Sequence, residues 1–208
     1  MKLNEMRSFV KKLVAVATAG LLVLLTGCAE VNAAATIGKT SISVKQVQDS
    51  VAEIMSERAK ITTTGMDLQT GEALNRAQVN FFVISELLRQ IAKQSKIVVT
   101  EAQITKEIAT VTEQVGGETE MPAALVNAGI APRNLREYFA TYLISSRISD
   151  ALLSAGISSS DVTAGVQQLV ISKADELKVS INPRYGAWDS ASAKITTAVL
   201  AGGSVIKK

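Results

Sequence analysis

The sequence predicts a mainly helical domain with a small antiparallel β element, an α+β fold. Apolar residues recur at spacings of three and four along most of the chain, as on the buried stripe of an amphipathic helix. Residues that start and stop helices bracket these stretches. Alternation of apolar and polar residues, which is typical of half-buried strands, is confined to residues 36–43 and 177–181.

The first thirty residues predict export and lipidation. Residues 1–12 carry four basic side chains and one acidic one, and an uncharged apolar run continues to Leu25. This run is too short to span a bilayer comfortably but suits a secretory signal peptide. It ends in Leu-Thr-Gly-Cys28, which resembles the bacterial lipobox. We expect residues 1–27 to be a lipoprotein signal peptide and Cys28 to be the lipidated mature N-terminus. The alternative is an uncleaved anchor helix with an incidental cysteine.

A lipobox implies covalent diacylglycerol on Cys28, with or without a further N-acyl chain. Two or more acyl chains anchor a protein stably, whereas one holds it only marginally. The expected location is therefore extracytoplasmic, on the outer face of the cell membrane. The small and polar residues 28–35 suit a tether between the lipid and the domain.

Composition argues against several function classes. The predicted signal holds four of the 22 basic residues and one of the 19 acidic ones, which leaves 18 of each in the mature chain. This balance disfavours nucleic-acid binding. The chain has no histidine and a single cysteine, so histidine-dependent catalysis and histidine or cysteine metal sites are not expected. We expect no catalytic residues, no metal and no other cofactor.

Acidic clusters and glycine pairs near turns do not change that expectation. They comprise Glu113, Glu118 and Glu120 around Gly116-Gly117, and Asp175 with Glu176. Charges beside turns are usually solvated surface, and the glycine pair lacks the preceding strand of a phosphate-binding loop.

Six helices are predicted, over residues 44–60, 72–93, 101–115, 121–128, 132–156 and 162–176. Ser43 and residues 158–161 offer caps, and Thr100 with Gln103 forms a capping-box pattern. The second helix is expected to be central, because its apolar seam is widened by further apolar residues. That seam consists of Leu74, Ala77, Phe81, Ile84, Leu88 and Ile91. The apolar stripes of the first and fifth helices are Val47, Val51, Ile54 and Met55, and Leu135, Tyr138, Phe139, Tyr142 and Leu143.

The C-terminal part predicts a strand, a turn and a tail. Residues 36–43 predict a hairpin of two short strands around a Gly-Lys turn, or else simply more linker. We expect the strand at 178–181 to pair with this N-terminal hairpin, because a lone hairpin is marginal in water. Residues 182–189 are rich in turn formers and hold the only tryptophan. Tyr185 and Trp188 either cap the core, which we favour, or form an exposed aromatic surface for clients. Residues 190–208 are expected to be a flexible tail.

This order of elements resembles the N-terminal domain of the SurA and PrsA class of extracytoplasmic chaperones. The match rests on residues 35–51, on "VVTEAQI" within residues 98–108, and on "VSINPRYGAWD" within residues 178–189. The match covers about residues 35–189, and we take residues 36–189 as the domain. Members with isomerase activity carry a histidine-containing parvulin domain of roughly a hundred residues. Only residues 156–175 occupy that interval here, so no isomerase activity is expected.

The resemblance implies a membrane-anchored chaperone or holdase that binds unfolded, exported polypeptides without ATP. Met55, Met66 and Met121 could form a flexible apolar rim for clients, or could equally fill gaps in the core. The main alternative function is an envelope adaptor lipoprotein that binds one folded partner. The sequence leaves the clients and the oligomeric state open.

Lipidation is tested by the variant Cys28→Ala. The variant should lose labelling by a radioactive fatty acid and accumulate as unprocessed precursor, because the thiol that receives diacylglycerol is absent. Unchanged labelling would contradict the prediction. Changing the neighbouring Thr26 to Ser provides a control in which labelling should persist.

Overall fold

The computed structural model describes residues 32–197, and the predicted signal peptide and Cys28 lie outside this range. The described part is mostly helical with small antiparallel sheets, so the α+β prediction is confirmed. The helices are α2 (Val44–Arg58), α3 (Gly71–Gln94), α4 (Glu101–Gln114), α5 (Met121–Ala128), α6 (Leu135–Ser154) and α7 (Val162–Leu177), with the 3-10 helices η1 (Pro132–Asn134) and η2 (Pro183–Tyr185). The strands are β1 (Ala33–Ile37), β2 (Thr40–Ser43), β3 (Ser180–Ile181), β4 (Ala187–Asp189) and β5 (Lys194–Thr196).

A three-stranded sheet of order β2-β1-β3 joins the two ends of the described chain. β1 and β2 form a hairpin in which Gly38 adopts φ 58°, a conformation that glycine takes without steric cost. β3 pairs antiparallel with β1, opposing Ala35 to Ile181. The predicted pairing of the C-terminal strand with the N-terminal hairpin is therefore confirmed.

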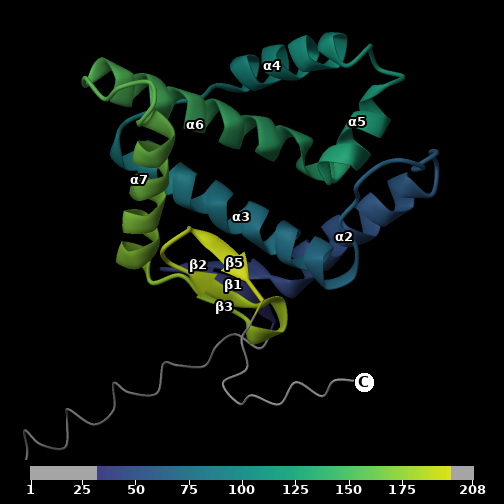
Figure 1. The fold of residues 1–208 in the computed structure, drawn as a ribbon, viewed down its shortest axis with the longest axis horizontal. Coiled ribbons are helices and arrows are strands. Elements are labelled where there is room, and N and C mark those ends of the chain that lie inside the picture. Colours follow the sequence, from purple (N-terminus) through teal and green to yellow (C-terminus); the bar gives the residue numbers. More distant parts are fainter. Residues whose placement is uncertain (1–31, 198–208) are drawn as a thin grey trace, which may run out of the picture. The chain divides into compact units, whose positions relative to one another are not determined.

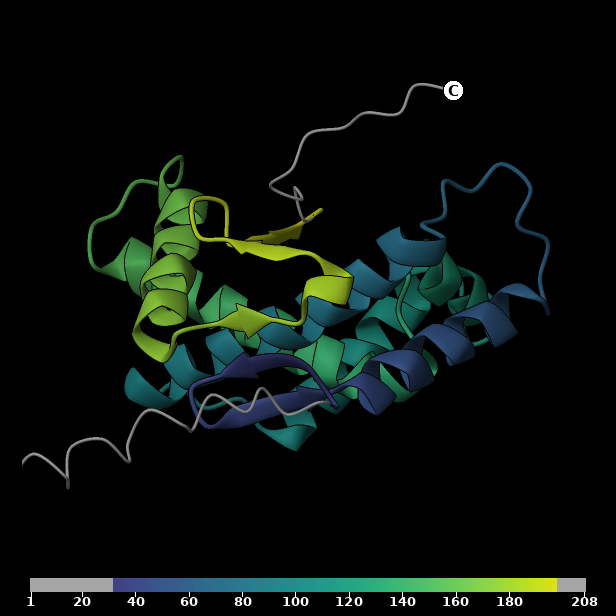
Figure 2. The same ribbon diagram turned by 90° about the horizontal axis from the view of Figure 1, so that it is seen from below.

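Helix α3 is the central helix, as predicted. It contacts the sheet, α2, α6, α7 and β5. In Figure 1, α3 lies between the sheet and α6, and α6 in turn lies between α3 and α4. Figure 2 shows the strands along one side of this helix. Because several neighbours cover it, burial extends beyond one stripe. Its buried residues are Leu74, Gln78, Val79, Phe82, Val83, Ser85, Glu86, Leu87, Leu88, Ile91 and Ala92.

Side-chain caps begin two of the described α-helices, α2 and α4. The Ser43 hydroxyl accepts a hydrogen bond from the Gln46 amide at 3.0 Å and caps α2. Both bonds of the predicted capping box of α4 are present, between Thr100 and Gln103. The predicted side-chain cap of α7 is wrong, because the Asp161 carboxylate accepts a hydrogen bond from the Ser158 hydroxyl instead of from the helix amides.

The predicted apolar stripe of α6 is only partly buried. Phe139 is in the core, whereas Tyr138 and Tyr142 are 38% and 51% exposed. The side of α6 that meets the main core carries Ile144, Ile148 and Leu152, at spacings of four. The two tyrosines are on a neighbouring stripe, so packing against α3 and α7 leaves them at the surface.

The folded unit is longer at both ends than predicted. Ala33, Ala34 and Ala35, predicted as tether, are buried residues of β1. Residues 190–197, predicted as tail, form a turn and strand β5, whose Ile195 is buried and donates its amide to the Asn80 side chain at 3.2 Å. Gly186 makes this hairpin possible, because a Cβ there would lie 2.0 Å from the Thr196 carbonyl oxygen.

A buried polar contact joins α2 to the start of α6. The Asn134 amide donates to the Ser50 hydroxyl at 2.7 Å, and both side chains are buried. Asn134 ends η1, immediately before α6. Since a buried polar group that loses its partner is costly, this pair fixes where α6 begins relative to α2.

Replacing Ile195 by Ala should lower the free energy of unfolding by about 2–4 kcal/mol, because a buried side chain leaves a cavity. Urea denaturation measures the change. The matched control Ile157→Ala alters an exposed isoleucine and should change stability by less than about 0.5 kcal/mol. Equal effects of the two variants would show that β5 contributes nothing to the core.

Replacing Asn134 by Ala should cost about 1–3 kcal/mol, since the buried Ser50 hydroxyl loses its hydrogen-bond partner. Thermal and urea unfolding measure this loss. Asn127→Ala changes an exposed asparagine of α5 and should be nearly neutral. If Asn134→Ala were also neutral, the α2–α6 contact would not contribute to the fold.

Candidate functional site

The three methionines predicted as a rim do not share one environment. Met55 on α2 is 48% exposed, and Met66 is partly buried in the loop between α2 and α3. Met121 is only 8% exposed, at the start of α5. The burial of Met121 favours the alternative in which this methionine fills a gap in the core. Of the three methionines, only Met55 is therefore exposed.

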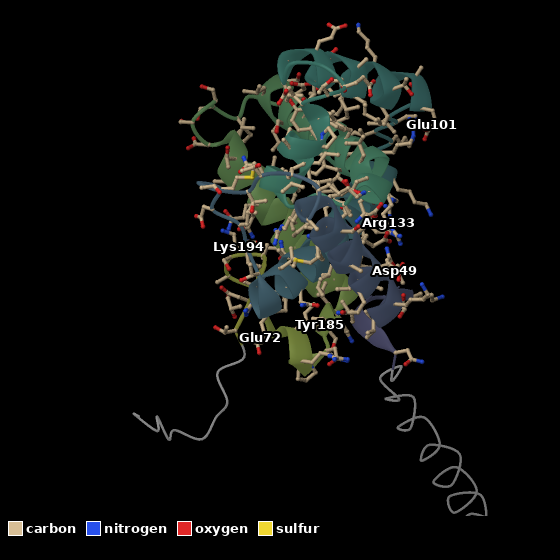
Figure 3. The ribbon with its side chains drawn as sticks, turned by 90° about the vertical axis from the view of Figure 1, so that its right-hand side faces the viewer. Asp49, Glu72, Glu101, Arg133, Tyr185 and Lys194 are labelled. Carbon is tan, nitrogen blue, oxygen red and sulfur yellow. The ribbon has the colours of Figure 1, made fainter. Side chains whose placement is uncertain are left out.

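The C-terminal aromatic residues belong to the core, the alternative that we favoured. Tyr185 is 5% exposed, and its hydroxyl accepts a hydrogen bond from the Gln48 amide at 3.5 Å. Figure 3 shows Tyr185 at the end of the molecule opposite Glu101. Trp188 is partly buried and packs against the same core. These rings cover the sheet and α3 and do not form an exposed aromatic surface.

An apolar hollow of about 180 Å³ lies between α3, the α5–η1 connection and α6, and we call it the α3–α6 groove. None of its lining residues is charged. They are Gln69, Ala77, Gln78, Phe81, Ala128, Gly129, Ile130, Ala131, Asn134 and Tyr138. The exposed Tyr142 follows Tyr138 by one helical turn, so the aromatic surface continues along α6 beyond the groove.

The walls of the α3–α6 groove are fixed by polar contacts. The buried Gln78 amide donates to the Gly129 carbonyl at 3.0 Å and ties the end of α5 to α3. Gly129 has φ 66°, the left-handed conformation in which α5 ends. On the other side, the Arg58 guanidinium donates to the Gln69 carbonyl at 2.7 Å. Partial burial lowers the pKa of Arg58 from its ordinary value. Hydrogen bonds made by polar groups of the lining residues thus hold the walls of the groove in place.

A second, polar hollow of about 260 Å³ lies beside β2, and we call it the β2 pocket. It is lined by Thr40, Ser41, Ile42, Gln46, Phe82, Glu86, Arg89, Asn134 and Glu137. Glu86 is buried and accepts hydrogen bonds from Gln90 at 2.7 Å and from Thr40 at 3.2 Å. Arg89 forms ion pairs with both Glu86 and Glu137. Two carboxylates therefore share one guanidinium at this pocket.

Surface ion pairs join α2 to η1 near both hollows. Arg133 binds Glu53 at 2.6 Å and Asp49 at 3.2 Å. Figure 3 shows Arg133 and Asp49 next to each other on one side of the molecule. A hydrogen bond from Lys45, with a further contribution from Arg133, lowers the pKa of Asp49 below its ordinary value. Because these side chains are solvated, the ion pairs contribute little to the stability of the fold, and their main effect is to orient the Arg133, Asp49 and Glu53 side chains.

The two hollows provide binding surfaces more readily than catalytic ones. The α3–α6 groove presents two aromatic rings, small apolar side chains and amide groups, which suit an apolar side chain of a ligand. Among residues 32–197, no three acidic side chains are grouped so that they could hold a metal ion.

Sequence patterns did not identify the groove, because Tyr138 and Tyr142 were assigned to the core by helical spacing. The hydroxyl groups of the two tyrosines are the sequence feature that could have indicated exposure, since a tyrosine ring often lies with its hydroxyl in water.

Comparison with known families gives one match. The family model described as the SurA-like N-terminal domain matches residues 3–149, and the match ends within α6. No curated protein and no solved structure matches the chain. Within the described residues, no helix has the length and apolar character needed to cross a membrane. The matched segment is well over half of the sequence, and it confirms the resemblance inferred from the sequence. The chain therefore belongs to the family of SurA-like N-terminal domains, a chaperone-related family.

Proposed function

We propose that this protein is a membrane-anchored extracytoplasmic holdase, which binds unfolded or exported polypeptides without ATP and without isomerase activity. The observation that carries the proposal is the uncharged α3–α6 groove with the exposed Tyr138 and Tyr142 beside it. Membership of a chaperone-related family supports polypeptides as the ligand class. The lipobox at Cys28 supports anchoring in the membrane.

The dimensions of the groove suit weak and repeated binding. A hollow of about 180 Å³ accepts one large apolar side chain at a time. Burying such a side chain contributes about 1.5–3 kcal/mol, which permits release without an energy source. Tyrosine rings add contact area at a low cost in conformational entropy, because they have only two rotatable side-chain bonds.

The absence of charge from the lining residues favours many clients over one partner. Interfaces for a single partner commonly use charged groups to reject others. The α3–α6 groove instead presents apolar surface and three amide side chains, those of Gln69, Gln78 and Asn134. Its selectivity should therefore depend on exposed apolar side chains, which unfolded polypeptides share.

The double variant Tyr138→Ser, Tyr142→Ser should suppress aggregation of chemically unfolded lysozyme much less well than the unmodified chain. Loss of two aromatic contacts predicts about a tenfold weaker apparent affinity. Light scattering measures the suppression. The melting temperature should change little, because both side chains are exposed.

The matched control is Leu153→Ser, Leu169→Ser, which removes two exposed apolar side chains that do not line the groove. This control should suppress aggregation as well as the unmodified chain. Equal suppression by the tyrosine variant would place client binding elsewhere. If the unmodified chain suppresses nothing, the holdase proposal fails, and the adaptor that binds one folded partner takes its place.

A further inference from the structure

The outer edge of β2 presents main-chain groups toward solvent. β2 is an end strand of its sheet and pairs only with β1 in the described part of the chain. In an antiparallel pair, hydrogen-bonded and non-hydrogen-bonded positions alternate. Ile37 and Thr40 flank the two-residue turn and form a hydrogen-bonded position, so Thr36 and Ser41 form the next, non-hydrogen-bonded one. The N–H and C=O of Ser41 are therefore directed away from β1.

This edge borders the β2 pocket, which carries a net negative charge. Ser41 and its two strand neighbours line the pocket, opposite residues of α3 and α6. The titratable lining residues are Glu86, Glu137 and Arg89. Since one guanidinium faces two carboxylates, one negative charge remains. The Glu137 side chain is about one third exposed and can meet an incoming cation, whereas Glu86 is buried.

We propose that the outer edge of β2 binds an extended segment of polypeptide as an added strand, and that a Lys or Arg side chain of this segment pairs with Glu137 at the β2 pocket. The occupant class, an unfolded polypeptide, rests on the proposed function. This site at the edge of β2 is separate from the α3–α6 groove. It would favour extended peptides with a positively charged side chain, whereas the groove would favour apolar side chains.

The chemistry of the edge favours this occupant over a second copy of the chain. Addition of a strand to a sheet edge uses main-chain hydrogen bonds that any extended peptide can supply. Only Ser41 offers an outward N–H and C=O in the middle of β2, so the main chain alone would bind weakly. An ion pair between a Lys or Arg side chain of the peptide and Glu137 would strengthen this weak main-chain binding. Two copies paired edge to edge would bring like-charged pockets together, which is unfavourable.

The test uses the full-length chain and fluorescein-labelled peptides of sequence Ser-Thr-Val-Thr-Lys-Thr-Val-Thr-Ser, with fluorescence anisotropy at low salt. The Lys peptide should bind about fivefold or more tightly than the same peptide with Glu at its centre. A Lys peptide N-methylated on both sides of the lysine should bind about tenfold more weakly, because it cannot pair with the strand edge. This comparison leaves the protein unchanged, so folding does not affect it.

The variant Glu137→Gln should weaken binding of the Lys peptide about two- to fivefold, as expected for a partly exposed ion pair. The control Glu113→Gln, at an exposed position of α4, should not. Equal binding of the N-methylated peptide, or equal binding of the Lys and Glu peptides, would overturn the inference.

The aggregation assay separates failure of this inference from failure of the proposed function. If the unmodified chain suppresses aggregation but the Lys peptide does not bind, the β2 edge is not a binding site and the holdase proposal stands. If the Lys peptide binds as expected but aggregation is not suppressed, the holdase proposal fails and the edge remains a peptide site.

Discussion

The pairing of β1 with β3 is the interaction on which the rest of the structure depends. It opposes Ala35 to Ile181, so residues at opposite ends of the described chain become neighbours. The Asn182 amide and side chain extend the contact by donating to the carbonyls of Ala34 and Ala33 at 2.9 and 3.0 Å. Closing so long a loop costs conformational entropy, which the burial of α3 against the sheet must offset. The helices and the sheet therefore stabilise each other as one unit.

Helix α3, which packs against this sheet, also contributes lining residues to the two hollows on the surface. Adjacent positions on it point to different neighbours, because each residue is rotated by about 100° from the last. Phe81 lines the α3–α6 groove, whereas Phe82 lines the β2 pocket. Asn134 lines both hollows and is fixed by its bond to Ser50. The helix that forms the core thus also positions both candidate binding surfaces on a rigid framework, which favours binding by preformed surfaces.

Much of the fold could be predicted from the sequence because it follows from strong local signals. The capping box at Thr100 and the seam of α3 each have a physical cause that acts over a few residues. Ala33, Ala34 and Ala35 were missed as a strand because alanine carries no β preference, and their burial comes from neighbours distant in sequence. Ile195 was missed for a similar reason, since small and polar residues surround it.

The candidate site was harder to predict, because exposure depends on which stripe of a helix its neighbours cover. Helical spacing placed Tyr138 and Tyr142 in the core, yet the residues that α6 contributes to the main core are Ile144, Ile148 and Leu152. At Met121 the sequence left a core position and a client contact equally open, and tertiary packing buries the side chain. Binding surfaces made of apolar side chains resemble core stripes in sequence, so tertiary packing decides between them.

The proposed holdase would contact many unfolded polypeptides through the surface beside Tyr142. The most direct measurement places a photo-crosslinking amino acid at position 142 in living cells, with position 169 on α7 as the comparison, and identifies the captured proteins by mass spectrometry. Position 142 should capture many unrelated exported polypeptides, and position 169 should capture few. Capture of one folded envelope protein at position 142, or equal capture at both positions, would contradict it.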